Sequence, residues 1–446
     1  RLSVDLQLSD PLSLVVNFND QLRTAMRLGD NPAGHFTLGG EAPRLPQQGG
    51  YKISGEVEEL ALNEVFETVS SISQSFGGGS SSAAPNIAVD LGVQTLTLGS
   101  LYLKQVGAEL NRLGQEWQLS LSGPDAGGLV SWSSAQPTYR AALNKLHLNK
   151  PETESTQVRE VEPEPTDRSI FEAVPAVDFD VADLRWNAAK LGRWRASLRP
   201  AQGSVELNSI RGEMQDVELN GSASWIMTDR ELTRVNLAYT GRDLGKTLES
   251  LGETRLIETD SLEGRVALAW EAAPWQVASD RMYGNFRFAA GKGRLLETSG
   301  GSGLLRLFGI LNFNTLVRRL QLDFKDLFAK GLVFDSLEGN FLLEEGVARS
   351  VVPLTMKGPS AGMLAEGAVD LGEKTLDMQV NVTLPLISNT PLAAVLLGAP
   401  QIAGALFLID KLIGDEIEKA TSIAYTLTGG WDSPELKLLE RQSDVK

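Results

Sequence analysis

The stretch DMQVNVTLP, Asp377 to Pro385, alternates apolar and polar residues along its length. Its apolar residues occupy every second position: Met378, Val380, Val382 and Leu384. Successive side chains of a β-strand point to opposite faces of the sheet, so this pattern predicts a strand with one apolar face and one wet face. Antiparallel sheets tolerate a solvated face, so we expect antiparallel pairing.

The same alternation recurs along most of the chain and predicts a mainly β fold. Turn signals at Gly123–Pro124 and Glu344–Gly346 separate the runs. The blocks that begin at Val89 and Val177 share one order of strand, turn, strand, polar bend and strand, which indicates a repeating β-architecture. The further apolar positions are Val177, Phe179, Val181; Val217, Leu219, Ala223, Trp225; Val235, Leu237, Tyr239; Leu262, Val266, Leu268, Trp270; and Ile423, Tyr425, Leu427.

Two polar stretches interrupt the strand pattern. Residues 149–169 are charged and contain prolines, and Gly77–Pro85 is a Gly/Ser run, so each predicts a loop that could mark a domain boundary. We expect β-repeats over 1–148 with a short helix near 62–76, a charged loop or linker over 149–176, β-repeats over 177–300, and a C-terminal region over 301–446 with helices near 303–320 and 391–413.

The C-terminal region holds a strongly apolar stretch without a charged residue from Ile387 to Ile409. Pro391 and Pro400 each suit the first position of a helix, and Gly398 ends the first one. The second helix would be about 20 Å long, short of the roughly 30 Å hydrocarbon core of a bilayer. The pattern therefore favours two short buried or re-entrant helices over a transmembrane span.

Composition excludes several functions. The 57 acidic and 41 basic residues give a net charge of −16, which disfavours nucleic acid as a partner. The chain has no Cys, which excludes disulfides and thiolate metal sites and suits an oxidising compartment. His35 and His147 are isolated, and no H-E-x-x-H, Walker or G-x-S-x-G motif occurs. We expect no enzyme, no metal and no cofactor. Trp225 and Trp270 lie on the apolar sides of their strands, which favours lining or core over a sugar platform.

Several segments are specific enough to compare with a family. They are Asp243–Gly252, Ser261–Trp270, Gly293–Ala348 (above all Arg318–Leu320, Leu322–Phe324, Asp326–Phe328 and Phe334–Ser336), Gly358–Ala361, the expected helical pair after Pro391, and Tyr425–Pro434. In these segments the chain resembles the C-terminal part of YhdP-type AsmA-like proteins of Gram-negative envelopes, closely over about 237–435 and only in strand rhythm before that. The family's N-terminal membrane anchor is not in this sequence, which begins RLSVDL without Met, so we expect a piece of a longer protein.

The resemblance implies a periplasmic protein that passes phospholipid between inner and outer membranes along a hydrophobic groove. The fold expected is an elongated, repeating antiparallel β-sheet curled into that groove, with a few short helices near the C-terminal end. The inner membrane would be reached through an N-terminal anchor absent from this chain, and the outer membrane surface through the C-terminal end. The expected lipid-binding residues are Val177, Phe179, Val181, Val235, Leu237, Val266, Leu268, Met378, Val380, Val382, Leu384, Ile423, Tyr425 and Leu427.

The apolar stretch after Pro391 would then lie at one mouth of the groove. The residues expected to contact the membrane are Leu392, Val395, Leu396, Leu397, Ile402, Leu406, Phe407, Leu408 and Ile409. Two alternatives stay open: a structural β-scaffold or envelope regulator without a lipid conduit, and a glycan-binding or glycan-processing protein. The sequence identifies no protein partner.

Overall fold

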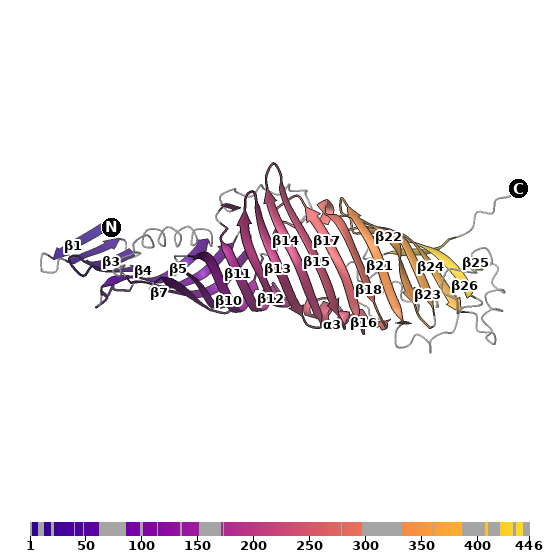
Figure 1. The fold of residues 1–446 in the computed structure, drawn as a ribbon, viewed down its shortest axis with the longest axis horizontal. Helices are drawn as coiled ribbons and strands as arrows, with labels where there is room; N and C mark the ends of the chain where they lie inside the picture. Colours follow the sequence, from indigo (N-terminus) through magenta and orange to yellow (C-terminus); the bar gives the residue numbers. More distant parts are fainter. Residues whose placement is uncertain are drawn as a thin grey trace. The chain divides into compact units, whose positions relative to one another are not determined.

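The structure is a computed structural model, and it confirms a mainly β fold (Figure 1). Two compact units make up the chain: residues 1–212 with 226–228 (unit 1), and residues 213–225 with 229–446 (unit 2). The residues described are 2–7, 13–18, 22–39, 41–47, 49–61, 86–98, 101–113, 115–133, 136–150, 171–172, 174–277, 279–296, 332–359, 361–385, 406–408, 420–430 and 434–439.

In unit 1 most neighbouring strands pair in antiparallel fashion. This holds from β1 to β4, from β6 to β10, and for β11 with β12. The strands are β1 (Leu2–Gln7), β2 (Ser13–Phe18), β3 (Leu22–Arg27), β4 (Ala33–Leu38), β5 (Gly50–Ala61), β6 (Ile87–Leu98), β7 (Leu101–Leu113), β8 (Glu116–Ser122), β9 (Ala126–Ser133), β10 (Gln136–Leu148), β11 (Ala176–Trp186), β12 (Ala189–Ala201) and β13 (Ser204–Met214).

Three pairs in unit 1 are parallel, which the sequence did not predict. They are β4 with β5, β5 with β6, and β10 with β11. Parallel strands cannot be joined by a tight hairpin and need a crossover connection. The chain meets this need with its longer connections, residues 39–49, 62–86 and 149–175. The charged stretch 149–176 therefore joins two strands that are hydrogen-bonded neighbours.

Unit 2 is an antiparallel series in which β15, β17, β18, β21, β22, β23, β24 and β26 pair in that order (Figure 1). A small sheet of β16, β19 and β20 and the short helix α3 accompany it. The elements are β14 (Val217–Met227), β15 (Glu231–Gly241), α3 (Leu244–Ser250), β16 (Ile257–Thr259), β17 (Leu262–Trp270), η1 (Ser279–Arg281), β18 (Tyr283–Ala290), β19 (Gly293–Leu295), β20 (Leu332–Phe334), β21 (Ser336–Glu344), β22 (Val347–Lys357), β23 (Gly362–Asp370), β24 (Thr375–Pro385), β25 (Leu406–Leu408), β26 (Ala420–Gly430) and β27 (Glu435–Leu438).

Two glycines of unit 2 allow the backbone of a neighbouring strand to approach closely. Gly284 and Gly367 have φ of +144° and +140°, a conformation that residues with a side chain rarely adopt. A Cβ atom at Gly284 would lie 2.0 Å from the carbonyl oxygen of Ala267 on the next strand. Glycine at these points therefore allows the close backbone approach that a bulged or strongly curved strand requires.

The prediction of a helix at Leu406–Leu408 is wrong. These residues form β25, which pairs with β26 in the register Leu406 opposite Ile423. One edge of β26 pairs with β24, and the opposite edge pairs with β25 and β27. Without β25 and β27, the backbone groups along that second edge would be unpaired. The need to satisfy that edge outweighs the local helical pattern.

The rest of 391–413 lies outside the described residues, as do the helices predicted near 62–76 and 303–320. Within the described ranges, no helix has both the length and the apolar character needed to cross a bilayer.

Candidate functional site

The apolar side chains of unit 2 form continuous rows that run from strand to strand. In the central row each residue is the register partner of the next, and none is more than 6% exposed. Because directly opposite residues in a sheet lie on the same face, the row is an unbroken apolar line across the unit. It consists of Leu262, Ala290, Leu337, Met356, Met363, Val382 and Ile423.

Two further rows lie on the same face, both on one side of the central row. The first passes through Val235, Leu268, Gly284, Leu343, Ala348, Val369 and Leu376. The second passes through Leu354, Ala365, Val380, Tyr425 and Leu438. Between the rows, the rings of Phe286 and Phe341 stack with centroids 4.8 Å apart. These residues together are called the apolar face of unit 2.

Unit 1 has an apolar face built in the same way. One row contains Val4, Val16, Thr24, Phe36, Ile53, Val89, Leu110, Leu119, Val130, Ala141, Phe179 and Ala196. A parallel row contains Phe18, Leu22, Leu38, Gly55, Leu91, Ala108, Leu121, Gly128, Leu143, Val181 and Trp194.

The first strands of unit 1 leave part of this face open. Val4 is 58% exposed, and Phe18 is 46% exposed opposite Leu22. Large apolar side chains gathered on one exposed face are typical of a binding surface.

The opposite face of β11 and β12 is charged. Asp178 and Asp180 alternate with the apolar residues of β11, and Arg193 Nη2 donates to Asp180 Oδ2 at 2.7 Å. Hydrogen bonds from Ser197 and Arg199 lower the pKa of Asp178, and the bond from Arg193 lowers that of Asp180. Both carboxylates therefore stay ionised in neutral solution and keep this face wet.

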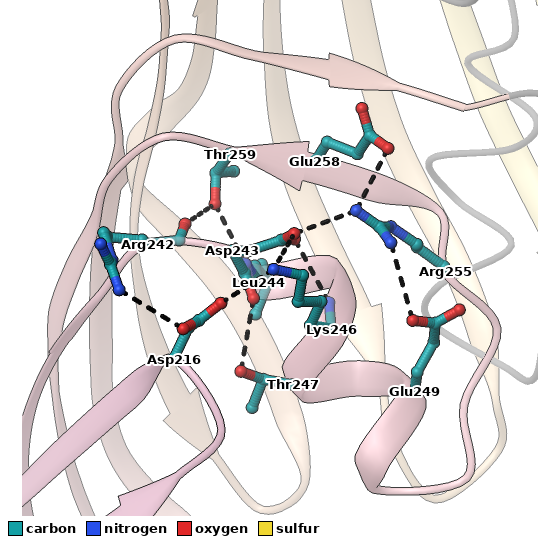
Figure 2. A network of polar contacts seen from close by, with 10 residues as sticks. All are labelled: Asp216, Arg242, Asp243, Leu244, Lys246, Thr247, Glu249, Arg255, Glu258 and Thr259. Carbon is teal, nitrogen blue, oxygen red and sulfur yellow. Dashed lines mark hydrogen bonds and ion pairs between the residues drawn. The ribbon is translucent and has the colours of Figure 1, made fainter.

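A polar network fixes helix α3 beside the small sheet in unit 2 (Figure 2). The Asp243 side chain caps the helix by accepting from the Lys246 backbone N–H at 3.2 Å. Arg255 Nη2 lies 2.9 Å from Asp243 Oδ2 and 3.2 Å from Glu258 Oε1, which ties α3 to β16. The apolar sides of these elements, through Leu244, Leu248, Ile257 and Phe334, pack against the core that contains the central row.

The histidines and tryptophans have structural partners. His35 Nε2 lies 2.9 Å from Ser54 Oγ, its Nδ1 accepts from the Arg44 backbone N–H, and burial lowers its pKa. His147 lies 3.1 Å from Asp183. Trp225 and Trp270 are buried, as predicted for lining or core. Among the described residues, no group of three potential ligands could hold a metal ion.

Most residues predicted to bind lipid fall on the two apolar faces. Met378, Val380 and Val382 lie opposite Leu427, Tyr425 and Ile423, and all six are buried. Val235 and Leu237 lie opposite Leu268 and Val266 and are half-buried. In unit 1, Val177, Phe179 and Val181 lie on the apolar side of β11, opposite Tyr139, Ala141 and Leu143. Leu384 lies in β24 opposite Thr421.

Most of the residues predicted to contact the membrane lie outside the described residues. Leu406, Phe407 and Leu408 form β25. The others lie outside the described residues: Leu392, Val395, Leu396, Leu397, Ile402 and Ile409.

Sequence reasoning missed the central row on β21 to β23. The signal was present in β21, where Leu337, Gly339, Phe341 and Leu343 occupy alternate positions. In β22 a bulge hides it, because the register with β23 shifts between Arg349 and Leu354 around Pro353. Proline cannot donate to a sheet ladder and is tolerated at such irregularities.

Comparisons with known proteins identify a family and one curated relative. The chain matches the YhdP family, described as YhdP protein, over residues 1–436. It is 25% identical over 280 residues to the "Intermembrane phospholipid transporter YhdP" of Escherichia coli (strain K12), an alignment that covers 62% of this chain. The matched part spans only 22% of that relative's length. No solved structure matches. The match over nearly its whole length shows that the chain belongs to the YhdP family.

Proposed function

We propose that this chain binds phospholipid acyl chains on its apolar faces and conducts phospholipid between the inner and outer membranes of a Gram-negative envelope. One observation carries the proposal: the apolar rows continue from strand to strand without a charged residue. The E. coli relative named as an intermembrane phospholipid transporter supports it.

Lipid acyl chains are costly to expose to water. A phospholipid carries roughly thirty methylene and methyl groups at about 0.8 kcal/mol each, so its free passage through water costs over about 20 kcal/mol. Adjacent strands are about 4.8 Å apart. An acyl chain therefore contacts the next apolar side chain of a row before it loses contact with the previous one. A lipid that moves along a row stays in apolar contact throughout.

This transport needs no catalytic group. The apolar faces hold the acyl chains, and the sheets are proposed to curl around them as a groove. Charged pairs such as Asp180 with Arg193 keep the opposite face in water. The protein would lie in the periplasm, reaching the inner membrane through a segment outside this chain, and residues 391–413 would contact the outer membrane.

One observation favours a structural β-scaffold as the second candidate. The central row is as buried as an ordinary core, with Leu337 at 1% and Met356 at 0% exposure. In that case the rows would be dry packing and would hold no ligand.

Native mass spectrometry of the detergent-free chain, expressed in a Gram-negative periplasm, separates the candidates. The lipid-conduit proposal predicts bound phospholipid that is released by delipidation and rebinds from vesicles. A chain that is folded by circular dichroism but carries no lipid before or after incubation would support the scaffold. Bound oligosaccharide would point to the glycan class.

A further inference from the structure

The apolar face of unit 2 contains a hydrogen-bond donor that has no use in a dry core. Tyr425 lies on β26 between Val380 and Leu438, and it is 6% exposed. Its hydroxyl has no hydrogen-bond partner among the described residues. Phenylalanine would fill the same space without a buried polar atom, so the hydroxyl calls for a partner that the described residues do not supply.

The apolar face of unit 1 contains two further buried donors that have no hydrogen-bond partner among the described residues. Thr24, at 7% exposure, is the polar member of its row, and its Oγ1 has no partner within the described ranges. Trp132, also 7% exposed, stands two positions from Val130, and its Nε1 likewise has no partner there. Its ring stacks on Trp117 with centroids 6.0 Å apart, which fixes its position.

Buried hydroxyls on the opposite faces are satisfied by the protein. Thr37 neighbours Phe36, and its Oγ1 donates to the Glu41 carbonyl oxygen at 2.9 Å. Thr383 neighbours Val382, and its Oγ1 donates to Ser422 Oγ at 3.4 Å. The three neutral donors that lack a partner among the described residues therefore all lie on the apolar faces, where the proposed ligand would pass.

We propose that Tyr425 in unit 2, and separately Thr24 and Trp132 in unit 1, each donate a hydrogen bond to an ester carbonyl oxygen of a diacyl glycerolipid bound beside that residue. The inference rests on the proposed function and specifies its ligand. A diacyl lipid carries two ester carbonyl oxygens next to its apolar chains, and these are acceptors without a donor of their own. A hydrocarbon or an ether-linked lipid of the same length brings no such acceptor to the face.

Tyr425 is suited to the donor role over the whole physiological range. Burial raises the pKa of Tyr425 to about 12, so its hydroxyl keeps its proton. The donor therefore does not switch off as pH changes.

A comparison of two lipids that differ only at the linkage tests the proposal. Delipidated full chain is titrated with diester phosphatidylglycerol and with diether phosphatidylglycerol of equal chain length. We expect the wild type to bind the diester about 3- to 10-fold more tightly, the range that one net hydrogen bond provides. Tyr425→Phe and Thr24→Val should each reduce this preference by weakening the binding of the diester lipid.

Thermal unfolding gives an independent readout that is not affinity. Tyr425→Phe should raise the Tm of the lipid-free chain, because an unpaired buried hydroxyl is removed, and lower the Tm of the diester-loaded chain relative to wild type. The control Thr383→Val loses a bond made within the protein, so it should lower both Tm values.

Equal wild-type affinity for the diester and diether lipids would overturn the proposal and leave the proposed function standing. Weaker binding of both lipids by Tyr425→Phe would also overturn it, because the acceptor would then be an oxygen that both lipids share. Binding of neither lipid by the wild type would overturn the proposed function as well.

Discussion

At the residue scale, the alternation along β24 separates two chemically different faces. Val380 is 1% exposed on the apolar face, opposite Tyr425, and Asn381 is half-buried on the other face. Adjacent residues in one strand therefore experience different surroundings. The pair allows a matched test in which the same side chain is placed on either face.

Val380→Asp should block lipid binding and destabilise the fold, whereas Asn381→Asp should do neither. A carboxylate at position 380 would be buried without a partner, which costs at least about 3 kcal/mol of stability or forces the group to stay protonated. Urea denaturation and lipid occupancy by native mass spectrometry measure the two effects. Similar behaviour of the two variants would show that the face assignment is wrong.

The carboxylates of β11 should make stability depend on acid pH. Hydrogen bonds lower the pKa of Asp178 and Asp180 in the folded chain, so the folded state binds fewer protons than the unfolded one. Their stabilising contribution is present above the unfolded pKa, near 3.9, and is lost as pH falls through the lower folded values. Both side chains are about two-fifths exposed, so the contribution is screened and small.

Denaturant titrations between pH 7 and pH 3 check this dependence. The wild type should be more stable than the Asp178→Asn/Asp180→Asn variant at pH 7. This gap, the difference between their free energies of unfolding, should shrink below about pH 4. A gap that stays constant across this range would refute the assigned ion pairs.

At the element scale, the glycine positions decide whether the strands can curve. Gly284→Val should cost roughly 2 kcal/mol or more, because φ of +144° is unfavourable for valine and its Cβ would clash with the Ala267 carbonyl oxygen. Gly252→Ala is the control: its φ is +85° with no atom within 4 Å of the added Cβ, so only about 1 kcal/mol of backbone cost is expected. Chemical denaturation gives both values, and equal losses would argue against the close approach at Gly284.

Strand existence could be predicted from alternation, and strand pairing could not. The period of two placed Val177–Val181, Val235–Tyr239 and Ile423–Leu427 in strands, as found in β11, β15 and β26. Pairing direction depends on contacts far apart in sequence, so the parallel pairs formed across residues 62–86 and 149–175 left no local signal. The strand at Leu406–Leu408 is a similar case, since the open edge of β26 determines it. The sequence could not predict that the Tyr425 hydroxyl lacks a partner among the described residues, because this depends on which residues surround it in the fold.

At the scale of the whole molecule, both units repeat one design. Each has apolar rows that cross successive strands, and the polar residues of β11, β12 and β24 lie on the other face. A scaffold needs only a buried core, whereas a conduit needs apolar contact that continues from strand to strand. The rows meet the stricter requirement in each unit.

Photo-crosslinking along the rows in living cells tests the conduit most directly. Benzoylphenylalanine would replace an aromatic residue on the apolar face of unit 1 (Phe36, Phe179) or of unit 2 (Phe286, Tyr425), in the full-length protein. Tyr283 is the control, because it lies on the same strand as Phe286 but is 41% exposed on the other face. We predict phospholipid adducts at all four apolar positions and none at Tyr283. Adducts at none of the four, or equally at Tyr283, would contradict it.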